Sequence, residues 1–144
     1  MIPKFLIILI LILMIPGLPQ ENRLSGELRV LIKGFANDLG KARLALYNSL
    51  DNFESHEQTF RTRVTSITEG TVYAVFDSIP YGEYAVKVFH DENENENLDT
   101  NFLGMPIEAY GFSNNARGSF GPAGWDDAKF LFSLPLDSIV IVVE

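Results

Sequence analysis

Aspartate or asparagine occupies every second position between residues 91 and 99. Calcium takes about six to eight oxygen ligands, and the calcium loop of helix-loop-helix proteins supplies them from alternate positions with this spacing. The pattern therefore predicts a calcium-binding loop, in which position 97 contributes its backbone carbonyl and the other positions contribute side-chain oxygens. The predicted metal ligands are Asp91, Asn93, Asn95, Asn97 and Asp99.

This stretch departs from the helix-loop-helix pattern at two positions. Glu96 stands where the sharp turn takes glycine, and Phe102 stands where the pattern has a bidentate glutamate. A neighbouring glutamate or a distant carboxylate would have to complete the calcium shell. The alternative is turn chemistry, because Asp and Asn cap turns through bonds from side chain to backbone. The acidic side chains crowded here repel one another unless a cation neutralises them, which favours calcium.

A long stretch rich in glycine and aromatic residues follows the acidic loop. Exposed aromatic rings on a rigid fold can stack on sugar rings, and amide or guanidinium groups can bond to hydroxyls. The stretch therefore predicts contact with a glycan or an envelope protein. The alternative is a self-packed loop whose aromatic residues form a satellite core, with one arginine paired to Asp126 or Asp127. The candidate contact residues are Tyr110, Phe112, Asn114, Asn115, Arg117 and Trp125.

Catalysis has little support in the sequence. Cysteine is absent, which excludes thiol nucleophiles and cysteine-based zinc sites. Neither His56 nor His90 has a nucleophile at a recognisable spacing. Asp126 and Asp127 could act as acid and base, but adjacent residues on a strand point to opposite faces. We expect a non-enzymatic protein, with a carboxylate-based hydrolase and a purely structural envelope protein without ligand as the alternatives.

The charge balance limits the class of partner. The chain has 144 residues, with 11 Lys and Arg against 19 Asp and Glu, for a net charge of −8. Such an excess of negative charge repels phosphate backbones, so nucleic-acid binding is not expected. The length suits one domain with a real hydrophobic core.

The first residues have the pattern of a secretory signal. A short head containing Lys4 precedes an unbroken apolar run from Phe5 to Ile15. This run is shorter than the roughly 20 residues of a transmembrane helix, which favours a cleaved signal peptide. An uncleaved membrane anchor is the alternative. We predict a signal peptide over residues 1–20 and a single domain over residues 21–144, without a stable membrane span. The protein is expected to be exported to the periplasm or the cell surface.

Short β-strands are predicted on both sides of the loop, because apolar and polar residues alternate with turn clusters between them. Residues 26–35 and 42–47 are expected to form a hairpin. Residues 71–90 are expected to form a second hairpin through a turn at Ile79–Gly82, and the final strand is expected to be covered on both faces. The other predictions are a short helical turn or an edge loop within 48–60, an edge strand at 61–68, and last strands at 128–132 and 138–143.

Some seven short strands separated by turn signals are typical of an all-β fold. We predict an antiparallel β-sandwich of immunoglobulin-like or transthyretin-like type, with one long ordered loop before the last two strands. The pattern does not distinguish these two topologies.

The sequence also resembles a known family in two adjoining runs, IPYGEYAVKVF and HDENENENLDTNFLGMPIEAYGFSNNARGSFGP. They resemble the signature of domain of unknown function 2141, an uncharacterised family of exported bacterial proteins. The resemblance spans Leu28 to Val143, and the run from Gly111 to Gly118 makes it specific. That family usually carries glycine after the third predicted ligand, where this chain has Glu96. The resemblance implies a secreted β-sandwich and no activity.

Overall fold

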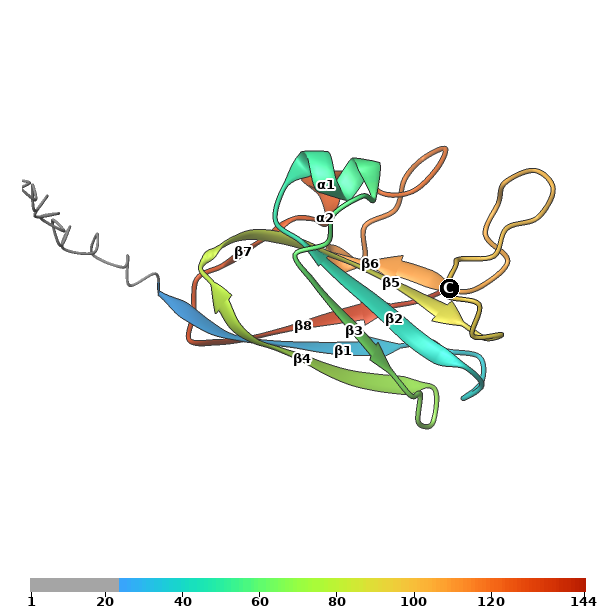
Figure 1. Ribbon diagram of the computed structural model, residues 1–144, viewed down its shortest axis with the longest axis horizontal. Helices are drawn as coiled ribbons and strands as arrows, with labels where there is room; N and C mark the ends of the chain where they lie inside the picture. Colours follow the sequence, from blue (N-terminus) through green and yellow to red (C-terminus); the bar gives the residue numbers. More distant parts are fainter. Residues whose placement is uncertain (1–23) are drawn as a thin grey trace, which may run out of the picture.

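Two β-sheets face each other in the computed structural model, which describes residues 24–144 (Figure 1). The predicted signal peptide therefore lies outside the described residues. The smaller sheet has the order β4 (Thr71–Pro80), β1 (Ser25–Lys33) and β8 (Leu136–Val142). The larger sheet has the order β3 (Arg61–Thr65), β2 (Lys41–Tyr47), β5 (Gly82–Asp91) and β6 (Tyr110–Phe112), and β7 (Phe130–Phe132) also pairs with β5. The all-β sandwich is confirmed, with one parallel pair, β1 and β8.

The main hydrophobic core lies between the two sheets. In β1, Leu28, Val30 and Ile32 are at most 1% exposed and alternate with residues that face solvent. In β2, Leu44 and Leu46 are buried in the same cluster. Side chains of a strand point alternately to opposite faces, so each strand buries one face between the sheets.

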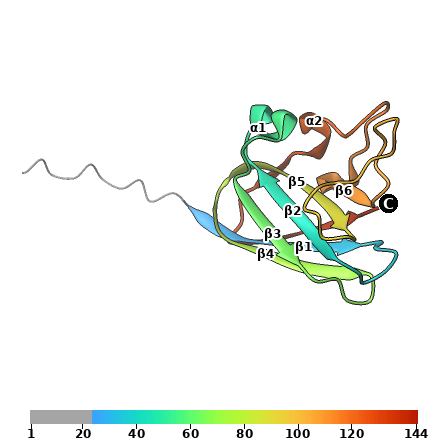
Figure 2. The same cartoon turned by 45° about the vertical axis from the view of Figure 1, so that its right-hand side comes forward.

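A second cluster lies on the outer face of the five-stranded sheet, beneath two short helices. These helices are α1 (Leu50–Ser55) and α2 (Trp125–Ala128), and Figure 2 shows them on the side of β2 and β5 that faces away from β1 and β4. Phe53 of α1 packs edge-on against Trp125 of α2, with 5.7 Å between ring centroids. Within residues 24–144, no helix is long and apolar enough to cross a membrane.

Both predicted hairpins are wrong, although their strands form. Strand β2 pairs with β3 and β5 instead of β1, and β4 pairs with β1 whereas β5 belongs to the other sheet. The chain changes sheet at Tyr81, between the end of β4 and the start of β5. Successive strands can bury their apolar faces side by side or face to face across a sandwich, and both arrangements give the same alternating pattern.

The expectation that the final strand is covered on both faces is also wrong. Strand β8 pairs only with β1, so it forms an edge of the three-stranded sheet. Leu136, Val140 and Val142 lie on its outer face and are 42–47% exposed, whereas Ile141 is buried. Two other expectations are confirmed: β3 is an edge strand, and α1 is the short helical turn within residues 48–60.

The long loop is ordered around an edge strand that is split in two. Strand β6 pairs with residues 87–89 of β5, and β7 pairs with residues 82–84. Between them, Ser113 of the short helix η1 (Ser113–Asn115) is fully buried, accepts a hydrogen bond from Val86 N–H at 2.9 Å and donates to the Ala128 carbonyl at 2.6 Å. The Ser113 hydroxyl thus replaces the strand pairing that is missing between β6 and β7.

Candidate functional site

The acidic loop begins at Asp91, the last residue of β5, whose side chain is fully buried. Its Oδ2 accepts hydrogen bonds from Arg43 Nε and from Glu96 N–H, and its Oδ1 accepts one from Asn95 N–H. Burial raises the pKa of Asp91, but Arg43 and the two backbone donors lower it by more, so the pKa lies below its usual value. Asp91 therefore remains a carboxylate held by protein donors.

The remaining predicted ligands are linked by hydrogen bonds within the loop. Asn93 Oδ1 accepts from Asn95 N–H at 3.1 Å, and Asn95 Oδ1 accepts from Asn97 N–H at 2.8 Å. The side-chain amides of Asn93 and Asn95 both donate to the carboxylate of Asp99, at 2.6 and 2.8 Å. The structure thus gathers these side chains in one loop and shows the turn chemistry that the sequence left as the alternative.

Glu108 closes the acidic loop and was missed by sequence reasoning. Its side chain is buried, with Oε1 accepting from Glu92 N–H and Oε2 from Asp99 N–H, both at 2.9 Å. A single glutamate between apolar residues gives no sequence signal for this role. Within residues 24–144, no three acidic or histidine side chains form a group that could hold a metal ion, and calcium stays a prediction.

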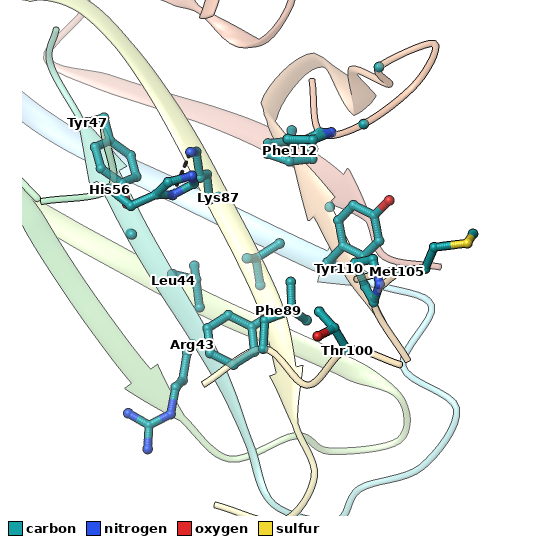
Figure 3. A pocket seen from close by; sticks show the side chains of 18 of the residues that line it. Arg43, Leu44, Tyr47, His56, Lys87, Phe89, Thr100, Met105, Tyr110 and Phe112 are labelled. Atoms are coloured by element: carbon teal, nitrogen blue, oxygen red, sulfur yellow. Dashed lines mark hydrogen bonds between the residues drawn. The ribbon is translucent and has the colours of Figure 1, made fainter. Parts of the chain in front are cut away.

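A groove of about 1060 Å³ lies on the outer face of the five-stranded sheet, beside the acidic loop (Figure 3). Its floor consists of outward-facing side chains from three adjacent strands. The register places Ala45, Lys87 and Phe112 in one row across the sheet. Arg43, Phe89 and Tyr110 form the next row. The site is therefore built from residues that are far apart in the sequence.

Two loops form the walls of the groove. One wall contains Leu98, Thr100 and residues 103–106, and the other contains residues 118–122. Figure 1 shows both loops on the side of the sheet where α1 and α2 lie. Large apolar side chains stand in solvent along these walls, with Leu103 69% and Met105 60% exposed and Phe120 fully exposed. The groove therefore has an apolar rim as well as a mostly apolar floor.

The lining contains no Asp, Glu, Asn or Gln among the described residues, although the chain is strongly acidic. Its charged groups are cations, Arg43, Arg63 and Lys87, and His56 lies beside them. Arg43 is already paired with Asp91. The groove therefore combines an apolar surface with basic groups and lacks carboxylates.

Lys87 is the half-buried cation of the floor. Its Nζ lies 3.0 Å from His56 Nδ1 (Figure 3). It also donates to the Phe53 carbonyl and stands 3.9 Å from the centre of the Phe53 ring. Burial lowers the pKa of Lys87 to about 8, opposed by Glu54. Burial, and then the charge of Lys87, lowers the pKa of His56, which ends α1 in a left-handed conformation.

Of the predicted contact residues, Tyr110 and Phe112 line the groove. Trp125 is only 7% exposed and lies in the second cluster, beneath the helices. This position agrees with the alternative prediction of a self-packed loop with a satellite core. Arg117 does not pair with Asp126 or Asp127; it forms an ion pair with Glu144 at 2.9 Å.

The two candidate asparagines, Asn114 and Asn115, form hydrogen bonds with backbone groups of other segments. The Asn114 amide donates to the carbonyls of Asp127 and Lys129, at 3.1 and 2.8 Å. Asn115 Oδ1 accepts from Val142 N–H at 2.8 Å and so ties η1 to β8. These contacts give both side chains structural roles.

Sequence reasoning missed most of the floor of the groove. Lys87 alternates with the core residues of β5, and its partners Phe53 and His56 lie more than thirty residues away in the sequence. The available signal was Phe89, a large apolar residue at an outward-facing position of β5, because an apolar side chain there must be covered by another element or by a ligand.

No curated protein and no solved structure matches the chain. A family model described as "Uncharacterized protein conserved in bacteria (DUF2141)" matches residues 30–138, which include the whole lining of the groove, strands β2 to β7 and parts of β1 and β8. The chain therefore belongs to this bacterial family, as its resemblance to the family signature implied.

Proposed function

We propose that this chain is an exported, non-enzymatic binding protein that holds an apolar ligand in the groove of its five-stranded sheet. The observation that carries the proposal is the joint presence of an apolar floor and exposed apolar side chains on the rim. Soluble proteins rarely leave large apolar side chains clustered in solvent unless these side chains contact something. The volume, about 1060 Å³, is at the upper end of the range for small-molecule sites.

An apolar ligand fits this lining better than the glycan expected from the sequence. Phe89 and Tyr110 could stack on a sugar ring. Sugar hydroxyls, however, are both donors and acceptors, and a site for them needs side chains of both kinds. The groove lacks side-chain carboxylates and amides among the described residues, so few groups could accept from a hydroxyl.

The acidic loop has a supporting role in this proposal. Asp91 and Glu108 hold its two ends through hydrogen bonds to the backbone, and the same loop continues into the wall at residues 98–106. A bound calcium ion would stiffen the same segment, but the proposal does not depend on calcium.

The proposal of a non-enzymatic role rests on the absence of carboxylates from the described lining of the groove. The carboxylates of the hydrolase alternative lie outside its lining, and Asp126 is 86% exposed and paired with Lys129 at 3.0 Å. A hydrolase with two carboxylates needs both to face one site. The geometry therefore favours binding over hydrolysis.

Titration with Nile red, a neutral apolar dye whose fluorescence rises in apolar surroundings, tests the proposal. We expect one dye molecule per chain, and an affinity about ten-fold weaker in the variant Phe89→Ser, since that ring lies on the groove floor. The matched control is Tyr73→Ser, which removes an aromatic ring that is 78% exposed on the other sheet. Absence of saturable binding, or an equal loss in both variants, would reject the groove as the binding site.

A further inference from the structure

We propose that the ligand is an amphiphile, a small molecule with an apolar chain that ends in a carboxylate, and that Lys87 binds this carboxylate with His56 beside it. The inference rests on the proposed function and names the chemical class of the ligand. Its basis is the position of one half-buried cation on the floor of a mostly apolar groove. The other two cations of the lining are Arg43, which is paired with Asp91, and Arg63, which donates to backbone carbonyls.

Lys87 lies where the groove meets α1. Its row on the sheet contains Ala45 and Phe112, and its amine extends toward the end of the helix, where His56 Nδ1 is 3.0 Å away. A ligand chain lying along the floor over Phe89 and Phe112 would therefore bring one end to the amine.

The amine has capacity for another partner. An ammonium group has three donors, and two of them are accounted for by the Phe53 carbonyl and His56. Among residues 24–144, no carboxylate forms an ion pair with Lys87, whereas Arg43 and Lys129 both have acidic partners. A half-buried cation without a carboxylate is costly, and an incoming carboxylate would relieve that cost.

The surroundings favour a single negative charge attached to an apolar body. The rest of the lining is mostly apolar and supplies no competing carboxylate. A polyanion would be repelled by the net charge of −8 of the whole chain. A monoanionic amphiphile matches both features, because its charge meets Lys87 and its chain meets the aromatic floor.

Calorimetry on the full chain with dodecanoate and dodecanol tests this inference. The two molecules share one apolar chain and differ in the charge at its end. At about pH 7, where Lys87 is largely protonated, we expect dodecanoate to bind at least about ten-fold more tightly than dodecanol. Lys87→Met should abolish this preference, so that dodecanoate and dodecanol bind about equally. Lys87→Gln, which keeps a polar side chain, should do the same.

The control is Lys33→Met, which makes the same change of charge on the exposed face of the other sheet. It should leave the preference for dodecanoate intact. The preference should also weaken as the pH rises above about 8 and Lys87 loses its proton, with His56, Glu54 and Tyr47 as the other titratable groups that face the amine.

The outcomes separate this inference from the proposed function. Equal binding of dodecanoate and dodecanol, or a preference that survives both Lys87 variants, overturns the role of Lys87 and leaves the apolar groove standing. Failure of both molecules while Nile red still binds overturns the amphiphile and again leaves the groove. Failure of all three probes overturns both proposals.

Discussion

Arg43 and Asp91 form an ion pair that joins the floor of the groove to the base of the acidic loop. The Asp91 side chain is fully buried and that of Arg43 is 20% exposed. Arg43 lies in the lining of the groove, and Asp91 also accepts from two N–H groups of the loop. A single carboxylate thus couples the loop to the sheet, and the loop in turn forms one wall.

Asp91→Ala should lower the free energy of unfolding by about 3 kcal/mol, because Arg43 loses its buried partner and Glu96 N–H loses its acceptor. Arg43 keeps only the exposed carboxylate of Glu96, and Asn95 N–H keeps only Asn93 Oδ1. Urea denaturation measures the change. Asp77→Ala is the matched control, since Asp77 is exposed on β4 and its loss changes the charge equally. Similar effects of the two substitutions would show that the ion pair contributes little.

Ser113→Ala should cost about 2 kcal/mol of unfolding free energy, because two buried backbone groups, Val86 N–H and the Ala128 carbonyl, lose their partner. Ser119→Ala, at an exposed position of the same long stretch, should change stability by less than about 0.5 kcal/mol. Denaturation curves of both variants check this prediction. A neutral Ser113→Ala would mean that the split edge strand does not depend on the hydroxyl.

As the pH rises, the free energy of unfolding of the natural chain should increase relative to that of the variant Lys87→Met. The pKa of Lys87 is lowered from 10.5 to about 8 by burial, so between these values the unfolded chain holds more protons than the folded chain. The free energy of unfolding therefore rises with pH in this window, and the charged amine is least favourable below about pH 8. Denaturation of both proteins at about pH 7 and about pH 10 measures the difference. A difference that stays constant, or that changes in the opposite direction, would contradict the half-buried position of the amine.

Calcium at about ten times its dissociation constant should add about 1.4 kcal/mol of stability and raise the melting temperature by several degrees, if the loop binds calcium as its spacing predicts. Asp99→Asn should remove this rise, because it removes a charged ligand and keeps only one of the two oxygens that accept from the amides of Asn93 and Asn95. Thermal melts in calcium and in chelator provide the measurement. Identical melts would leave turn formation as the role of these residues.

The sequence by itself was sufficient to predict the all-β sandwich, the edge position of β3, the helical turn at α1 and the family. Alternation with period two shows which residues of a strand face inward, and this information is local. The acidic loop was also found from its spacing, because turn-forming residues act on neighbours a few positions away.

Only the tertiary structure decided which strands pair and where the groove lies. Strands β1 and β2 bury their apolar faces across the sandwich from each other, and their alternation would have been the same in one sheet. The groove needs Arg43 from β2, Lys87 from β5 and Tyr110 from β6 to lie side by side, together with His56 from the end of α1. These contacts join residues distant in the chain, and no local pattern records them, because they arise when the two sheets bury their shared core.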